Sequence, residues 1–205
     1  MNKSRHLPAD QRKEMTVRAV VDLCGKEDPA RITTASIAKH MKVTQGALFR
    51  HFASKDAIWK AVAEWVAERV MQRLDKAARQ ADSPLGALEA MFMAHIGFIV
   101  EHPGVPRMMM GQLQHGRPTP ARRMVFSLLS GYRERIEVLL NEGCEQGELR
   151  ADLDIEAATT QFVGTIQGLV MQSLIAGDVR QTLELAPGAF GIYRQGIVAQ
   201  QGEKS

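Results

Sequence analysis

Residues 33–52 of this chain read TTASIAKHMKVTQGALFRHF, and residues 54–56 add SKD. The stretch predicts two short helices on a tight turn, because a hydroxyl residue precedes each apolar-periodic segment and can cap it. Thr33 or Thr34 would cap the first helix and Thr44 the second, while Ser54 would cap a longer helix that follows. Two short helices in this order form a helix-turn-helix, which places its second helix in the major groove of DNA. The sequence therefore predicts a DNA-binding protein and not an enzyme.

The second short helix carries the residue types that recognition of DNA requires. Thr44 can cap it and touch phosphate, and Gln45 can form a bidentate pair with adenine. Ala47 can contact a thymine methyl group. Farther along, Arg50 and His51 are placed for phosphate or a nearby base, and Lys55 is a natural phosphate contact. With these six residues, the predicted DNA-binding set also contains Thr33, Thr34, Gly46 and Phe49.

The composition is consistent with a DNA-binding module at one end of the chain. Residues 1–60 carry 12 Lys and Arg against 6 Asp and Glu, whereas the remainder carries 14 against 17. A basic first segment before an acidic remainder favours a polyanionic partner. The two cysteines, Cys24 and Cys144, are too few for a disulfide framework, so we expect reduced thiols and a cytoplasmic protein. The polar, basic start is unlike a signal peptide.

The rest of the chain reads as helix. Gly and Pro cluster between long windows of helical periodicity, and sustained period-two alternation is absent. We predict an all-α fold of about nine helices from these windows and their caps. Pro187 is expected to begin the last helix, which would end near Gln200. The apolar segment from Ala87 to Val100 is too short to span a bilayer, so we expect no membrane association.

The helix-turn-helix stretch resembles the TetR (tetracycline-repressor-like) family of bacterial transcription regulators. That family carries a pattern close to T-x-x-x-I-A-x-x-A-G-V-S-x-G-x-L-Y-x-H-F-x-S/N-K-E, which residues 33–56 follow without a gap. Two departures stand out. The usual Ala-Gly of the turn is Met41-Lys42, and a left-handed Lys42 would cost about 1 kcal/mol relative to glycine. The usual Tyr is Phe49, which lacks the hydroxyl that bonds a phosphate and retains ring packing.

The resemblance implies a helix-turn-helix DNA-binding domain over residues 8–55 and a helical ligand-binding and dimerisation domain over residues 56–201. It also implies a homodimer on a double-stranded DNA operator, regulated by a small-molecule inducer, with no cofactor. The implied pocket residues are Phe92, His95, Phe98, Met109, Leu113 and Phe126. The implied dimer interface lies on the last two helices, with Ala158, Phe162, Gly164, Ile166, Leu169 and Tyr193.

Simpler interpretations of these two sets stay open. Most of the pocket residues could be ordinary core, and His95 could be a hydrogen-bonded core histidine. Gly164 and Gly168 could simply allow close packing of helices within one chain. A membrane dimer motif does not account for them, because the apolar twenty-residue run that this motif requires is missing. The output could also depend on a protein partner, with no small inducer involved.

A catalytic or metal site finds little support in the sequence. His95, His102 and His115 lack the i,i+4 spacing of a helical zinc site, and no carboxylate pattern joins them. A Gly-rich phosphate loop and a nucleophile elbow are also missing from the sequence. We therefore expect neither catalysis nor a bound metal.

Overall fold

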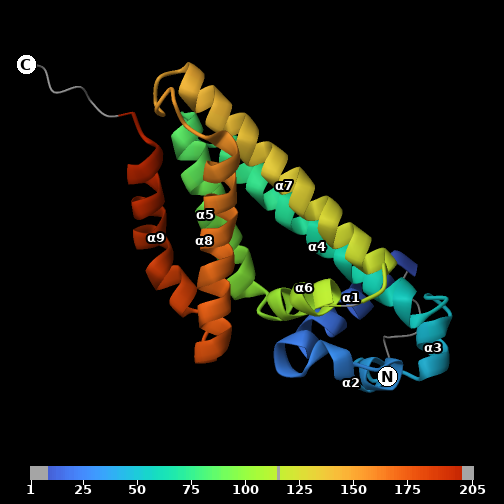
Figure 1. The fold of residues 1–205 in the computed structure, drawn as a ribbon. Helices are drawn as coiled ribbons and strands as arrows, with labels where there is room; N and C mark the ends of the chain where they lie inside the picture. The colour runs from blue at the N-terminus through green and yellow to red at the C-terminus, as the bar shows by residue number, and fades with distance from the viewer. Residues whose placement is uncertain (1–8, 115, 200–205) are drawn as a thin grey trace, which may run out of the picture. The chain divides into compact units, whose positions relative to one another are not determined.

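The computed structural model describes residues 9–114 and 116–199 (Figure 1). Within these ranges the chain forms nine α-helices and a short 3₁₀-helix, with only an isolated bridge between Leu149 and Val198, which confirms the all-α prediction. The elements are α1 (Ala9–Lys26), η2 (Pro29–Arg31), α2 (Thr34–His40), α3 (Gln45–Phe49), α4 (Lys55–Ala78), α5 (Pro84–Glu101), α6 (Gly104–Gln114), α7 (Pro120–Glu145), α8 (Ile155–Ala176) and α9 (Gln181–Ile197). Residues 8, 115, 200 and 201, which several predictions include, lie outside the described residues.

Side-chain caps begin the helices where the sequence predicts them. The Thr33 hydroxyl accepts from the amide of Ser36 at 3.0 Å, and the Thr33 amide donates to Ser36 Oγ at 2.9 Å, so Thr33 is the α2 cap. The Thr44 hydroxyl accepts from the amide of Ala47 at 3.2 Å and begins α3. Ser54, Ser83, Thr119 and Asp154 make the same kind of bond at the starts of α4, α5, α7 and α8. Each bond pairs an amide that the helix itself leaves without a partner.

The last helix begins earlier than predicted. α9 starts at Gln181, and Pro187 lies inside it. A proline is tolerated best in the first turn, which made Pro187 a start signal in the sequence. Residues 181–186 instead form the first turns of the helix, in which Thr182 and Ala186 are buried. Burial of these side chains therefore extends the helix ahead of its proline.

The chain divides into two compact units. The first unit comprises Met1–Arg69 and His102–Leu128, and the second comprises Val70–Glu101 and Leu129–Ser205. This division differs from the predicted boundary between residues 55 and 56. The first 14 residues of α4 after that boundary, up to Arg69, together with α6 and the start of α7, belong with the helix-turn-helix.

Helix α6 joins the first unit through close backbone packing on α1. A Cβ added at Gly104 would overlap the carbonyl oxygen of Val21 and would lie 2.7 Å from the amide nitrogen of Gly25. Glycine at this position therefore lets two helix backbones approach more closely than any side chain permits. This contact joins segments that are far apart in the sequence, and the helical periodicity of either segment does not reveal it.

The second unit is built around an aromatic cluster. Phe92 of α5 lies with its ring centroid 5.4 Å from that of Phe162 on α8 and 5.3 Å from that of Phe190 on α9. Tyr193 also packs on Phe162, at 5.5 Å. Edge-to-face pairs at these separations contribute about 0.5–1.5 kcal/mol each beyond the burial of their area. The cluster holds α8 and α9 against α5, as the ribbon shows (Figure 1).

Helix α5 is long and apolar enough to meet the length and composition of a membrane span, with 18 residues at a mean hydropathy of 1.3. The helix is thus longer than the predicted segment from Ala87 to Val100. Eight of its side chains, among them Leu88, Met91 and Ile96, are buried within the protein. Its apolar composition is therefore accounted for by the core of the second unit.

Candidate DNA-binding surface

The turn between α2 and α3 closes α2 with a Schellman motif. The Lys42 amide donates to the Lys39 carbonyl at 3.1 Å, and the Val43 amide donates to the Ala38 carbonyl at 2.9 Å. Lys42 lies at the position that this motif usually gives to glycine, with a φ of +56°. It is the only residue other than glycine with a positive φ in the described ranges. The left-handed lysine that the sequence suggested is therefore present.

Replacing Lys42 with glycine is expected to stabilise the protein by about 1 kcal/mol, because glycine adopts a positive φ without the steric cost of a Cβ. Urea denaturation followed by circular dichroism measures the change. Lys39→Gly is the matched control, because Lys39 is an exposed residue inside α2 with a helical backbone. That variant is expected to lose about 1 kcal/mol. A loss of stability in both variants would contradict the assigned strain.

The inner faces of α2 and α3 hold the motif on the first unit. Ile37 and Ala38 of α2 are buried, as are Leu48 of α3 and Phe52 after it. With these four side chains turned inward, the remaining residues of α3 face outward. The local sequence therefore determines which side of the short α3 helix is available to a partner.

The outer surface contains the whole predicted DNA-binding set. Every one of its ten residues is exposed or half-buried in the structure. Phe49 is 46 % exposed, which is unusual for a large aromatic side chain. At Gly46 an added Cβ would meet only the Thr44 hydroxyl, at 3.9 Å, so packing within the chain does not require glycine there. Both features suit a surface that another molecule covers.

One contact on this surface escaped prediction from the sequence. The side-chain amide nitrogen of Gln45 (Nε2) donates to the Thr34 hydroxyl at 3.0 Å, which links α3 to the first residue of α2. The bond uses one of the two N–H donors of Gln45 and leaves the other donor and the carbonyl oxygen. Those two groups are the pair that a bidentate contact with adenine uses. Thr34 therefore holds Gln45 in one orientation without consuming its base-reading groups.

Positive charge surrounds the motif. Lys39, Lys42, Arg50 and Lys55 are exposed, and the described residues supply none of them with an acidic partner. Lys55 is the first residue of α4, where the helix dipole adds to its positive potential. Lys39 and Lys42 were absent from the predicted set, although their place beside the turn was readable from the sequence.

The predicted ligand-binding residues fall into different parts of the fold. Phe92, His95 and Phe98 belong to the second unit, whereas Met109, Leu113 and Phe126 belong to the first. Phe92 and Phe98 are buried, while Leu113 and Phe126 are 38 % and 48 % exposed. The structure therefore does not gather the six into one compact unit, and the core interpretation fits Phe92 and Phe98.

His95 lies in the interior of the second unit with a polar partner. Its Nδ1 lies 3.2 Å from the Tyr132 hydroxyl, and burial lowers the pKa of His95 from 6.5 to about 4. The ring is therefore neutral at pH 7. Two further polar atoms in this unit, Thr159 Oγ1 and the Tyr193 hydroxyl, are buried and find no hydrogen-bond partner in the part of the chain that the structure describes.

Most of the predicted dimer-interface residues are core residues of a single chain. Ala158, Phe162, Ile166, Leu169 and Tyr193 are all at most 9 % exposed. Gly164 is exposed, and an added Cβ there would meet nothing within 4 Å. Five of the six residues are therefore buried within the single chain, and their place in a dimer interface stays a prediction.

The opposite sides of α8 and α9 carry a stripe of exposed residues and one half-buried residue, Gly168, and all of them except Gln161 are apolar or glycine. Its members recur at steps of three and four: Gln161, Gly164, Gly168, Met171 and Ile175 on α8, and Leu185, Gly188 and Ile192 on α9. Ile175 is 80 % exposed and Ile192 is 72 % exposed. No atom lies within 4 Å of a Cβ placed at Gly168 or Gly188, so packing within the chain does not require these glycines. We call this set the α8–α9 stripe.

Comparison with known proteins matches two parts of the chain to one family of regulators. Residues 15–62 match the family model described as "Bacterial regulatory proteins, tetR family", and residues 110–186 match "Tetracyclin repressor-like, C-terminal domain". A protein of Marinobacter nauticus named nucleoid occlusion factor SlmA is 30% identical over 142 residues, which cover 69% of this chain and 71% of that protein.

Two solved structures share the fold. The ketosteroid transcriptional regulator KstR2 of Mycobacterium tuberculosis superposes with a TM-score of 0.75 at 20% identity, over 92% of this chain and 96% of that one. The Bacillus subtilis transcriptional regulator FadR in complex with stearoyl-CoA gives 0.76 at 18% identity, over 90% and 98%.

The fold and the exposed surface of α3 define a helix-turn-helix DNA-binding protein with a helical C-terminal domain. This chain belongs to the TetR family of bacterial regulatory proteins, and it is a DNA-binding regulator.

Proposed function

We propose that this regulator is a repressor that binds a palindromic operator as a homodimer and leaves it when a small, mainly apolar ligand binds its C-terminal domain. The DNA-binding part rests on the outward face of α3, where four residues are exposed: Gln45, Gly46, Phe49 and Arg50. The lysines beside this face have no acidic partner among the described residues. The buried inner face fixes this orientation.

The proposed operator follows from the symmetry of the dimer. Each copy would place α3 in one major groove, so the two half-sites would be inverted repeats about 34–36 Å apart, or a multiple of that spacing. Selection of bound duplexes from a random pool tests this directly. Enrichment of an inverted repeat supports the proposal, whereas enrichment of a single unpaired half-site argues against it.

Gln45 and Lys55 are expected to differ in what they contribute to DNA binding. Gln45→Ala should lose about 1–3 kcal/mol of discrimination at one base pair of each half-site, because the amide reads a base edge. Lys55→Gln should weaken binding to all duplexes alike and should reduce the salt slope by about 1, because a lysine at phosphate releases counterions. Fluorescence anisotropy with the operator and with single-base variants, at several salt concentrations, measures both effects.

Lys60→Gln is the control for charge alone. Lys60 is exposed on α4 and pairs with Glu64 at 2.8 Å, so its neutralisation should leave the operator affinity nearly unchanged. An unaltered base preference in Gln45→Ala would refute the assigned base contact.

The homodimer part of the proposal rests on the α8–α9 stripe. Exposed apolar side chains on two adjacent helices, interleaved with glycines, allow a close approach of helices from a second copy. Two helices from each copy would then form a four-helix interface.

The ligand part of the proposal draws on the interior of the second unit. Thr159 Oγ1 and the Tyr193 hydroxyl are buried polar atoms without partners among the described residues, and His95 is a neutral ring beside Tyr132. Such groups can orient an apolar ligand that bears a few polar atoms. The FadR structure with stearoyl-CoA is a fold relative with an apolar ligand. Release of the operator on addition of an apolar compound from a cell extract would support this part.

A second candidate keeps the DNA-binding activity and replaces the small ligand with a protein partner. The observation that favours it is the relative from Marinobacter nauticus, whose name, nucleoid occlusion factor, refers to the nucleoid and to no small molecule. The two candidates predict different releasing agents. An extract from which macromolecules have been removed by filtration should still release the operator under the first candidate and should be inactive under the second.

A further inference from the structure

The first unit contains a cavity of about 370 Å³ that the proposed function does not use. It is lined by η2, the start of α4, the end of α6 and the start of α7, and its residues all belong to the first unit. Its size falls in the lower part of the range of about 300–1,000 Å³ for small-molecule sites. The predicted ligand-binding residues line no part of it.

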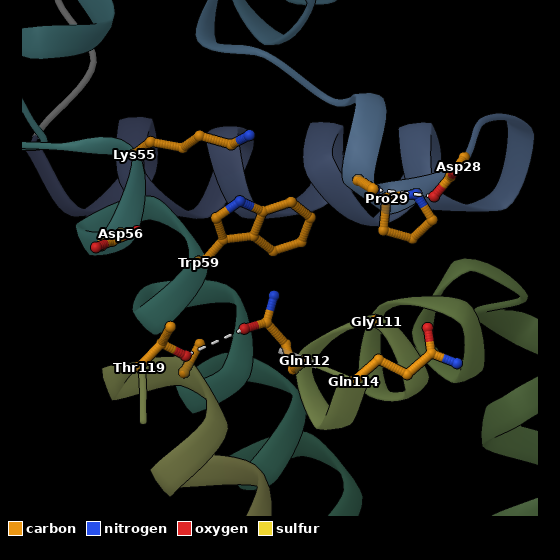
Figure 2. Close-up of a pocket in the computed structure, with 11 residues that line it drawn as sticks. Asp28, Pro29, Lys55, Asp56, Trp59, Gly111, Gln112, Gln114 and Thr119 are labelled. Carbon is orange, nitrogen blue, oxygen red and sulfur yellow. Dashed lines mark hydrogen bonds between the residues drawn. The ribbon is translucent and has the colours of Figure 1, made fainter. Parts of the chain in front are cut away.

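The cavity holds hydrogen-bond donors that the protein leaves unused. Gln112 is only 3 % exposed, and its carbonyl oxygen accepts from the Thr119 hydroxyl at 3.4 Å. That bond turns the amide nitrogen toward Trp59, as Figure 2 shows. Trp59 is 6 % exposed, and neither its indole N–H nor the Gln112 amide nitrogen has a partner among the described residues. Both residues line the cavity, so an acceptor on a bound molecule could reach these donors.

Lys55 adds a positive charge to the same cavity. Its side chain extends over the Trp59 indole, whereas Asp56 points away from that ring (Figure 2). The other acidic residue of the lining, Asp28, already accepts the Ala30 amide at 2.9 Å as the cap of η2. The Trp59 ring is therefore flanked by the Gln112 amide on one side and by the Lys55 ammonium on the other, the side of its own N–H (Figure 2).

The remaining lining is apolar. The indole of Trp59, the ring of Pro29 and the methyl groups of Ala30 and Ala121 provide it. A ligand that matches this arrangement has acceptor oxygens with negative charge at one end and an apolar, flat body that packs on the indole. We propose that this cavity binds a small aromatic carboxylic acid, with Lys55 and the Trp59 indole N–H holding its carboxylate.

Occupation of the cavity would also affect DNA binding, a consequence that rests on the proposed function. Lys55 is the residue assigned to phosphate, and a carboxylate paired with its ammonium would compete for the same charge. The acid would therefore lower operator affinity without any movement of the C-terminal domain.

Nuclear magnetic resonance of the two tryptophan indoles tests the site without DNA. The full-length, ¹⁵N-labelled protein is titrated with benzoate, and Trp59→Phe and Trp65→Phe assign the two indole N–H signals. The Trp59 signal is expected to shift saturably, while that of Trp65, outside the cavity lining, stays in place. Benzamide, which has the same ring without the charge, should bind about tenfold more weakly because it lacks the charge-assisted bond.

Variants distinguish binding of benzoate in the cavity from its effect on operator affinity. Lys55→Gln, an exposed substitution with little risk to folding, should weaken benzoate about tenfold, and Lys60→Gln should leave its affinity unchanged. An immobile Trp59 signal, equal binding of benzamide, or an unaltered affinity in Lys55→Gln would overturn the site. A Trp59 shift accompanied by undiminished operator affinity in benzoate would overturn only the competition. A wild-type protein that ignores every duplex would refute the proposed function and leave the indole titration valid.

Discussion

Ile192→Glu is expected to convert the proposed dimer into a monomer. Ile192 is 72 % exposed on α9 within the α8–α9 stripe, so the variant would place two charges in a desolvated interface without a partner. A monomer contacts one half-site only, and affinity for the full palindrome should fall by on the order of 10²–10⁴-fold through the loss of bivalent binding. Sedimentation equilibrium measures the mass, and fluorescence anisotropy measures the affinity.

Val138→Glu is the matched control for Ile192→Glu. Val138 is 55 % exposed on α7, outside the stripe, so its charge should leave both the mass and the operator affinity unchanged. Circular dichroism should show the same helix content in both variants. If Ile192→Glu remained a dimer, the stripe would not be the interface. If the wild-type protein were a monomer, the proposed homodimer would be wrong.

Gly104→Ala is expected to destabilise the protein by about 3 kcal/mol, the upper end of the usual cost of overpacking. The added methyl group would meet the backbone of α1 at Val21 and Gly25, and a backbone cannot move aside as a flexible side chain can. Helix α6 would have to shift away from α1. Urea denaturation measures the loss, and the operator affinity at low temperature shows whether the folded remainder still binds DNA.

Gly86→Ala provides the control within a helix. A Cβ at Gly86 would lie 3.5 Å from the Ser83 hydroxyl oxygen and 3.6 Å from the Ala81 Cβ, which is ordinary contact. This variant should gain up to about 1 kcal/mol from the better helix propensity of alanine. A Gly104→Ala protein as stable as Gly86→Ala would show that α1 and α6 pack less closely than described.

The parts of the fold that the sequence predicted are those determined locally. A cap needs only a hydroxyl or carboxylate and an amide three residues later, so spacing predicted Thr44, narrowed two other caps to Thr33 or Thr34 and to Asp152 or Asp154, and the structure selects Thr33 and Asp154. The exposed face of α3 was predictable for the same reason, because Leu48 and Phe52 mark its buried side. A left-handed Lys42 was suggested by the glycine that the family pattern carries at this position, and the structure shows that backbone conformation.

The parts that escaped prediction depend on contacts between distant segments. Phe162 and Tyr193 lie on helices whose residues are apolar on more than one side, so periodicity did not tell the core side from the α8–α9 stripe. The early start of α9 depends on burial of Thr182 and Ala186, which outweighs the signal of Pro187. The cavity beside Trp59 is lined by η2, α4, α6 and α7, and these come together only in the folded first unit.

The contact between Val21 and Gly104 has a consequence for how the protein is made. The first unit combines residues up to Arg69, which the ribosome releases early, with residues from His102 onward, which follow only after all of α5. Assembly of the first unit must therefore wait until the residues from His102 onward have been made. Closing so long a loop costs entropy that local helix formation does not recover. A nascent chain that ends before α6 would expose the apolar side of α1, and the regulator would become competent to bind DNA only after translation has passed into its C-terminal half.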